Sequence, residues 1–243
     1  MKNKGRTIFI WDIHGCYDEL KLLIKKVWIN KHDRVYCVWD IINKGPKSFK
    51  VLKFFYKYKE QYKCVIWNHE VGFLRWIDGK APEYNCKAYR NLREKIETKK
   101  PELMSFLKNL PLYIEEDNFI VLHWWILPGK KLEEHSIDEI ANLREHEWKP
   151  WYNYYTWSKK IIYWHWAMNG VQIREKTIWL DSGCVYGWFL SAYILETNEL
   201  IWQKALETYI NIQNTKKHTS LSKKIINFIK WKFKKLKNTP TIK

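Results

Sequence analysis

The segment Thr7 to Leu20, TIFIWDIHGCYDEL, constrains the fold most, because an apolar run there ends in polar residues and passes directly into an amphipathic stretch. We expect a strand over the apolar run, then a turn and a helix that covers one face of a sheet. The turn carries Asp12 and His14 at the carboxyl end of the strand, the edge at which α/β sheets gather their reacting groups. This spacing is typical of a metal half-site. Trp11 conflicts with it, since we expect the backbone to turn tightly at that residue.

The alternation of strand and helix continues and predicts a βαβαβ opening, a helical middle and a mainly β second half. Predicted strands cover residues 7–10, 34–38, 63–66, 112–115, 119–122, 160–163, 177–180, 190–195 and 200–205. Predicted helices cover residues 17–27, 46–58, 84–97, 101–109 and 136–145. We expect two sheets with flanking helices, and the helical region near 84–109 as a cap over one edge of the site.

Polar clusters end five of the apolar strands. They are Asp12 and His14; Asp40, Asn43 and Lys44; Asn68, His69 and Glu70; His123; and His165. A single histidine beside a core is more often a hydrogen-bonded packing residue than a ligand, but five such endings in succession favour a shared metal site. Carboxylate and amide oxygens with imidazoles suit Mn, Fe or Zn, and a set so poor in thiolates is not typical of a structural zinc.

Composition narrows the class of protein. The chain has 243 residues, of which 46% are hydrophobic and 17% aromatic, so one sizeable domain with a buried core can form. The five cysteines are odd in number and lack a CxxC pair, so we expect reduced core thiols in a cytoplasmic protein. No signal-peptide core and no apolar stretch of spanning length is present, which disfavours secretion and a transmembrane anchor.

The formal charge of +17 is concentrated at one end of the chain. Lys216–Lys243 holds ten lysines and no acid, which leaves 17 − 10 = +7 for the rest. We expect a domain over residues 1–207 and a basic tail over residues 208–243. Apolar residues recur at helical spacing in the tail, at Leu221, Ile225, Ile229, Phe233 and Leu236. They fit either an interfacial amphipathic helix or, the favoured alternative, a solvated and partly frayed helix.

With these motifs in view, the chain resembles the PPP-type branch of the calcineurin-like metallophosphoesterases, the serine/threonine phosphatase family. The branch pattern GDxHG, GDxxxxGP, GNHE or GNHD, HxG and GH corresponds here to WDIHG, WDIINKGP, WNHE, HWW and WHW. The runs DIHGCYDEL, NKGPKS, YWHWA and LDSGCVYG are closer still to symmetrical bis(5'-nucleosyl)-tetraphosphatases. The resemblance covers about residues 6–207 and implies an α/β fold with a two-sheet β-sandwich core flanked by helices (α-β-β-α).

The resemblance also implies a site with two divalent metal ions, manganese being expected and Fe, Zn or Co being alternatives. Asp40 would bridge both ions, and the implied ligand set is Asp12, His14, Asp40, Asn68, His123 and His165. A metal-bridging hydroxide would attack phosphorus, with His69 as the general acid. Arg144 matches a phosphate-gripping arginine or is a solvated helix residue. Protein phosphatases of this branch read GDxVDRG where this chain has Asn43, able to hydrogen-bond His69, and Lys44, a point-charge phosphate contact.

Tryptophan stands where the family pattern has glycine. These positions are Trp11, Trp39, Trp67, Trp125, Trp164 and Trp188; Trp124 replaces a small residue, and Trp28, Trp148, Trp157 and Trp179 fall at loop positions that suit glycine. We interpret them as UGA codons printed as Trp and read as Gly in the organism, which the AT-rich look of the composition supports. The alternative is a Trp-bearing pseudoenzyme. Overpacking at ~1–3 kcal/mol per site, repeated at six or more sites, would exceed the ~5–15 kcal/mol stability of a domain.

The leading functional expectation is hydrolysis of a dinucleoside polyphosphate, diadenosine tetraphosphate giving two ADP. The alternatives among enzymes are a Ser/Thr protein phosphatase and a general nucleotide phosphatase. An alternative of another class is a catalytically inactive nucleic-acid or membrane-binding protein that acts through its tail. In the leading case we expect no specific nucleic-acid partner, and at most a weak contact between the tail and an anionic surface.

Overall fold

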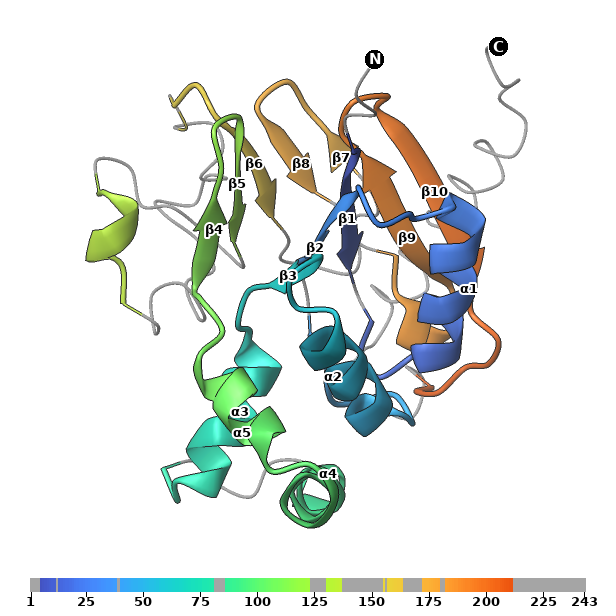
Figure 1. Cartoon of the computed structure of the whole chain (residues 1–243), viewed down its shortest axis with the longest axis vertical. Helices are drawn as coiled ribbons and strands as arrows, with labels where there is room; N and C mark the ends of the chain where they lie inside the picture. The colour runs from blue at the N-terminus through green and yellow to red at the C-terminus, as the bar shows by residue number, and fades with distance from the viewer. Residues whose placement is uncertain are drawn as a thin grey trace, which may run out of the picture.

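Two five-stranded sheets form the centre of the chain in a computed structural model, which describes residues 5–11, 13–38, 40–80, 86–122, 130–136, 155, 157–163, 172–179 and 182–211 (Figure 1). The first sheet has the order β10-β9-β1-β2-β3 and the second the order β4-β5-β6-β8-β7. The strands are β1 (Thr7–Trp11), β2 (Arg34–Cys37), β3 (Tyr62–Cys64), β4 (Tyr113–Glu115), β5 (Phe119–Leu122), β6 (Lys160–Tyr163), β7 (Gln172–Ile173), β8 (Thr177–Trp179), β9 (Phe189–Ile194) and β10 (Glu199–Lys204).

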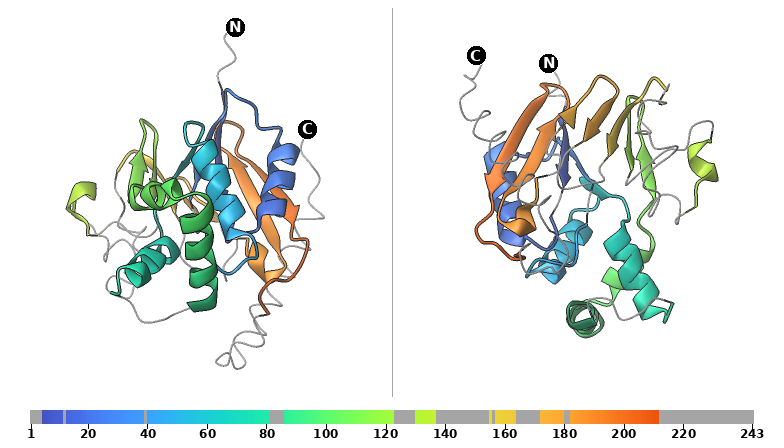
Figure 2. Two further views of the ribbon diagram at one scale, coloured as in Figure 1. Left: turned by 60° about the horizontal axis from the view of Figure 1, so that its bottom comes forward. Right: turned by 180° about the vertical axis from the view of Figure 1, so that it is seen from behind.

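The helices group into two sets. They are α1 (Tyr17–Val27), α2 (Ser48–Lys57), α3 (Asn68–Ile77), α4 (Cys86–Lys99) and α5 (Glu102–Lys108), with short 3-10 turns η1 (Leu132–Glu134) and η3 (Cys184–Tyr186). Helix α1 packs on β9 and β10 and α2 on β3, so both cover the outer face of the first sheet. Helices α3, α4 and α5 lie together beyond the ends of β1, β2 and β3 (Figures 1 and 2).

The direction of the strands positions the site. In the first sheet β1 pairs in parallel with β2, and β2 in parallel with β3, while β9 and β10 complete the sheet in antiparallel pairing. The carboxyl ends of β1, β2 and β3 therefore share one edge. The segments that follow them hold His14, Asp40 and Asn68. Three polar clusters that are far apart in the sequence thus meet at one edge of the sheet.

The strands of the first sheet are buried on both faces because their side chains alternate between two cores. In β1, Ile8 and Ile10 join the core beneath the helices, whereas Phe9 and Trp11 join the core between the sheets. Phe9 meets Phe119 of the second sheet edge to face, with ring centroids 5.1 Å apart. The face-to-face packing of two sheets, with helices outside, confirms the predicted α-β-β-α architecture.

Most predicted elements are observed with ends shifted by up to two residues. The ranges of α1, β5 and β6 are as predicted, and α4 and α5 occupy the expected cap region. The prediction missed α3, which begins at Asn68, and the two-residue strand β7. The predicted helix 136–145 and the tail beyond residue 211 lie outside the described residues. None of the described helices is long and apolar enough to cross a membrane. Cys16, Cys37, Cys64 and Cys184 are buried and form no disulfide with one another.

The expected tight turn at Trp11 is wrong. Trp11 is the last residue of β1 and pairs with Ser191, and the left-handed conformations fall later, at His14 (φ 40°) and Gly15 (φ 73°). The Trp11 side chain is fully buried, and its indole Nε1 has no hydrogen-bond partner among the described residues. An indole N–H in a core normally has such a partner.

Trp28 fits the glycine interpretation in a different way. It ends α1 in the left-handed conformation (φ 54°, ψ 46°), and its backbone N–H caps the helix. Its side chain is 83% exposed. Helix ends of this kind strongly favour glycine, because a Cβ strains the left-handed backbone.

Candidate metal centre

The loops after β1 and β2 are held together by backbone hydrogen bonds. The His14 N–H donates to the Asp40 carbonyl (2.7 Å), and the Gly45 N–H donates to the His14 carbonyl (2.7 Å). Gly45 is required at this contact, since a Cβ there would lie 2.1 Å from the His14 carbonyl oxygen. The two loops therefore form one unit, and His14 and Asp40 are placed together by the backbone.

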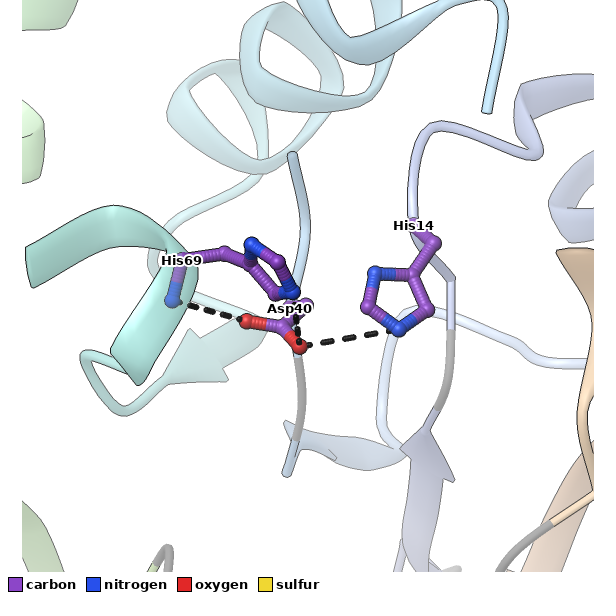
Figure 3. A group of neighbouring side chains, drawn as sticks. All are labelled: His14, Asp40 and His69. Atoms are coloured by element: carbon purple, nitrogen blue, oxygen red, sulfur yellow. Dashed lines mark hydrogen bonds and ion pairs between the residues drawn. The ribbon is translucent and has the colours of Figure 1, made fainter. Parts of the chain in front are cut away.

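Figure 3 shows the imidazoles of His14 and His69 on either side of the Asp40 carboxylate. Asp40 Oδ2 lies 3.5 Å from His14 Nε2 and 3.8 Å from His69 Nε2. The His69 backbone N–H donates to Asp40 Oδ1 (3.3 Å). One ligand atom from each of these residues lies within 4.8 Å of the others, and the side chains of His14, Asp40 and His69 are only 3%, 2% and 12% exposed. We call this group the catalytic cluster.

Both histidines of the catalytic cluster are neutral near pH 7. Burial lowers the pKa of His14 well below its usual value, and the charges of Lys44 and His69 lower it further. Burial and the charge of Lys44 lower the pKa of His69 to about 3. Neutral imidazole is the form that binds metals, so the His14 ring is in the state that a metal ligand needs.

The donor set suits a divalent cation. The Lys44 Nζ approaches His14 Nε2 to 3.2 Å, so the structure itself places a positive charge against this ring nitrogen. A buried carboxylate between two neutral imidazoles is the combination that Mn, Fe and Zn accept. The site therefore fits the metal that the sequence predicts.

Asn43 fixes the tautomer of His69. Its side-chain Oδ1 accepts the Lys44 backbone N–H (2.8 Å), so its amide Nδ2 faces His69 Nδ1 (2.7 Å). The amide donates here, so Nδ1 of His69 accepts and the ring proton of the neutral form lies on Nε2. That nitrogen is the one that faces Asp40, and the expected bond between Asn43 and His69 is confirmed.

Glu70 holds the loop that carries Asp40, a role that the sequence did not reveal. Its Oε1 accepts the backbone N–H groups of Ile41 and Ile42, both at 3.1 Å. The residue is 1% exposed, and burial raises the pKa of its carboxyl to about 7 against the lowering effect of these bonds. The start of α3 is thereby tied to the loop that carries Asp40.

The structure brings together some of the predicted site residues. His14, Asp40, His69, Asn43 and Lys44 form one group, and Asn68 is the exposed first residue of α3 beside them. Asp12, His123, Arg144 and His165 lie outside the described residues. Strand β5 precedes His123 and strand β6 precedes His165. These two strands are adjacent and parallel in the second sheet.

The chain has two facing β-sheets and a buried His-Asp-His cluster at the carboxyl ends of parallel strands. These features define a metal-binding α/β enzyme built on two sheets. A family model described as calcineurin-like phosphoesterase matches residues 5–202. The chain belongs to the calcineurin-like phosphoesterase family, and it is a metal-dependent hydrolase. The resemblance stated from the motifs is confirmed.

Relatives within the family sharpen the likeness. The chain is 25% identical over 272 residues to the symmetrical bis(5'-nucleosyl)-tetraphosphatase of Vibrio parahaemolyticus, covering 83% of this chain and 99% of that protein. It is also 25% identical to the zinc-dependent endopolyphosphatase of Saccharomyces cerevisiae, covering 76% and 74%. A crystal structure assigned as a diadenosine tetraphosphatase superposes with a TM-score of 0.71 at 25% identity, covering 85% of this chain and 96% of that one.

Proposed function

We propose that this chain cleaves diadenosine tetraphosphate symmetrically to two ADP. The single observation that carries the proposal is the buried Asp40 between two neutral imidazoles at the edge of the sheet, in a chain similar over 83% of its length to a symmetrical bis(5'-nucleosyl)-tetraphosphatase. Manganese is the proposed metal, and the proposed ligands are Asp12, His14, Asp40, Asn68, His123 and His165.

When bound, two divalent ions would supply an activated water and neutralise charge on the phosphate oxygens. The protein would add proton transfer and charge. We assign His69 the role of general acid: as the imidazolium, with Nε2 facing Asp40, it would donate a proton to the departing ADP oxygen and return to the neutral ring. Lys44 contributes a cation beside His14, and Arg144 is a further proposed phosphate contact.

Substrate choice can be tested directly. Manganese-loaded protein is assayed with diadenosine tetraphosphate, ATP and a phosphoserine peptide, and the products are separated by chromatography. We expect ADP as the sole nucleotide product and weak activity on the peptide. AMP with ATP as products, or faster turnover of the peptide, would contradict the proposal. Asp40→Asn is the inactive comparison, and Asp117→Asn in the exposed β4–β5 turn is the matched control.

The glycine interpretation belongs to this proposal, because it decides which protein is assayed. We propose that the working chain carries glycine at positions 11, 39, 67, 125, 164 and 188. Two observations support it: the indole nitrogen of Trp11 has no hydrogen-bond partner in the part of the chain that the structure describes, and the backbone of Trp28 is left-handed. The assay therefore compares the chain that has tryptophan at these positions with the chain that has glycine there. Peptide mass spectrometry of the protein from its own organism identifies the residue at each position. Tryptophan at positions 11 and 67 in that protein would refute the interpretation.

A further inference from the structure

A second cluster of potential ligands, separate from the catalytic cluster, lies at the first turn of α1. Cys16 precedes the helix, Glu19 lies one turn along it, and Cys184 opens η3 in a distant part of the chain. One ligand atom from each residue lies within 4.8 Å of the other two. All three residues are 0% exposed. We call this group the cysteine cluster.

Glu19 is the unusual member, because it is a fully buried acid that forms no ion pair with a described Lys, Arg or His, although it interacts at longer range with the charge of Lys47. Its Oε1 accepts the Leu206 backbone N–H (3.1 Å) and the Tyr209 hydroxyl (2.8 Å). Its Oε2 has no hydrogen-bond partner within the described ranges, and no described Lys, Arg or His forms an ion pair with it. A buried carboxylate normally requires both a partner for each oxygen and a compensating charge.

We propose that Cys16, Glu19 and Cys184 bind a structural zinc ion that is separate from the catalytic metals. Two thiolates and a carboxylate supply three of the four ligands that a tetrahedral zinc takes, and their summed charge of −3 attracts a divalent cation. Around a tetrahedral zinc, sulfur ligands at about 2.3 Å stand roughly 3.8 Å apart. The present separations of at most 4.8 Å would close by about 1 Å. On binding, the two thiols would release their protons to solvent.

The surroundings of Glu19 fit this role. The Tyr209 hydroxyl and the Leu206 N–H both engage Oε1, so they orient the carboxylate and leave its other oxygen for the ion. Tyr209 and Ile210 also donate their backbone N–H groups to the Val185 carbonyl, each at 3.0 Å. An ion at this point would join α1, η3 and the segment after β10, in addition to these hydrogen bonds and the apolar packing between them.

The proposal is tested by counting metal in a chain that cannot hold the catalytic ions. Asp40→Asn serves as the background, purified under reducing conditions with added zinc and then passed through a mild chelator. We expect one zinc per chain to remain. Adding Cys16→Ala, Cys184→Ala or Glu19→Gln should remove it, with zinc affinity falling more than the ~10–100-fold that loss of an outer hydrogen-bond partner costs.

Cys37→Ala is the matched control. Cys37 and Cys64 form another buried thiol pair in mutual contact, but no described third ligand completes a cluster there. This variant should retain the zinc. A background chain that retains no zinc, or Cys16→Ala and Cys184→Ala chains that both retain it, would overturn the proposal and leave hydrogen bonds between thiol and carboxylate as the role of the cluster.

Cobalt substitution keeps the test decisive if a variant fails to fold. A cobalt ion bound by two thiolates gives an intense near-ultraviolet charge-transfer band, whereas a site of oxygen and nitrogen ligands does not. We expect the band in the folded Asp40→Asn and Cys37→Ala chains. Its absence from the folded Asp40→Asn chain refutes the zinc site on its own, whatever the state of the cysteine variants, and says nothing against the phosphatase proposal.

Discussion

The catalytic cluster and the cysteine cluster begin two residues apart, at His14 and Cys16, yet they differ in chemistry and in access. The first is built from loops and a helix start, offers nitrogen and oxygen ligands, and has the exposed Asn68 at its margin. The second offers sulfur and carboxylate on the buried face of α1. One short turn therefore supplies residues to an accessible site and to a closed one, and only the accessible site can admit a substrate.

This comparison predicts that the first cluster controls turnover and the second controls stability. The largest effect is expected for Asp40→Asn, because the buried carboxylate between two imidazoles is lost. Turnover of diadenosine tetraphosphate should fall about 10³-fold or more, while the melting temperature changes by a few degrees at most. Steady-state kinetics and calorimetry measure both. A variant that retains a tenth of the activity would show that the carboxylate is not central.

His69→Gln should give the next largest loss, about 10²–10³-fold in kcat with a small change in KM, since it removes a proton donor. Changing the leaving group of the substrate distinguishes proton donation by His69 from its other possible roles. A nitrophenyl ester, whose leaving group needs no proton, should lose much less activity than diadenosine tetraphosphate does. Equal losses on both substrates would mean that His69 acts as a ligand or in positioning.

Asp33 is a further buried carboxylate, and the protein itself supplies its counter-charge through Arg6. Its two oxygens accept bonds from the Arg6 side chain at 2.7 and 3.2 Å. Burial alone would raise its pKa, but these bonds and the N–H groups of Asn30 and Arg6 hold the pKa below its usual value. Asp33→Asn should therefore cost about 2 kcal/mol of stability at pH 7.

The pH dependence gives this prediction a sign. A carboxylate whose pKa is lowered by folding adds stability above its unfolded pKa of about 3.9, and this stability is lost as the pH falls through the lower folded pKa. The gap between the parent chain and Asp33→Asn should thus be full at pH 6 and shrink below about pH 4 in urea unfolding. A gap that stays constant down to pH 3 would contradict it.

The smallest effect is expected at the other end of α1. Trp28→Gly should raise stability by about 1 kcal/mol, because glycine adopts the left-handed conformation at this helix end without strain. Trp76→Gly, inside α3, is the opposite control and should lower stability by at least about 1 kcal/mol. Thermal unfolding measures both. A destabilising Trp28→Gly would remove the structural support for glycine at that position.

Sequence reasoning predicted those parts of the fold that depend on local periodicity. β1 follows directly from a continuous apolar run and α1 from helical spacing. Parallel strands place the residues after β1, β2 and β3 at one edge. α3 was missed because it contains Gly72 and begins within the polar cluster that was assigned to a strand end. Glu70 reads in sequence as one more polar residue, and only the fold reveals that it faces the backbone after Asp40.

The cysteine cluster could not be predicted for a different reason. Cys16 and Glu19 are three residues apart, a spacing that occurs on any helix, and Cys184 reaches them only through the return of the chain by η3 and β9. Nothing local marks that contact. The catalytic motifs, by contrast, are compact, and each follows its own strand.

The hydrogen bonds that Glu70 accepts from the backbone of Ile41 and Ile42 have a consequence for which metal the site binds. Since that carboxylate fixes the main chain and not a ligand side chain, the position of Asp40 is set before any ion arrives. Ions of similar size then meet the same preformed ligands, and affinity among first-row divalent metals follows their intrinsic order. The metal found in the purified protein should therefore depend on the metal content of the growth medium. Cultures enriched in manganese or in zinc would yield enzyme loaded with different metals from one gene.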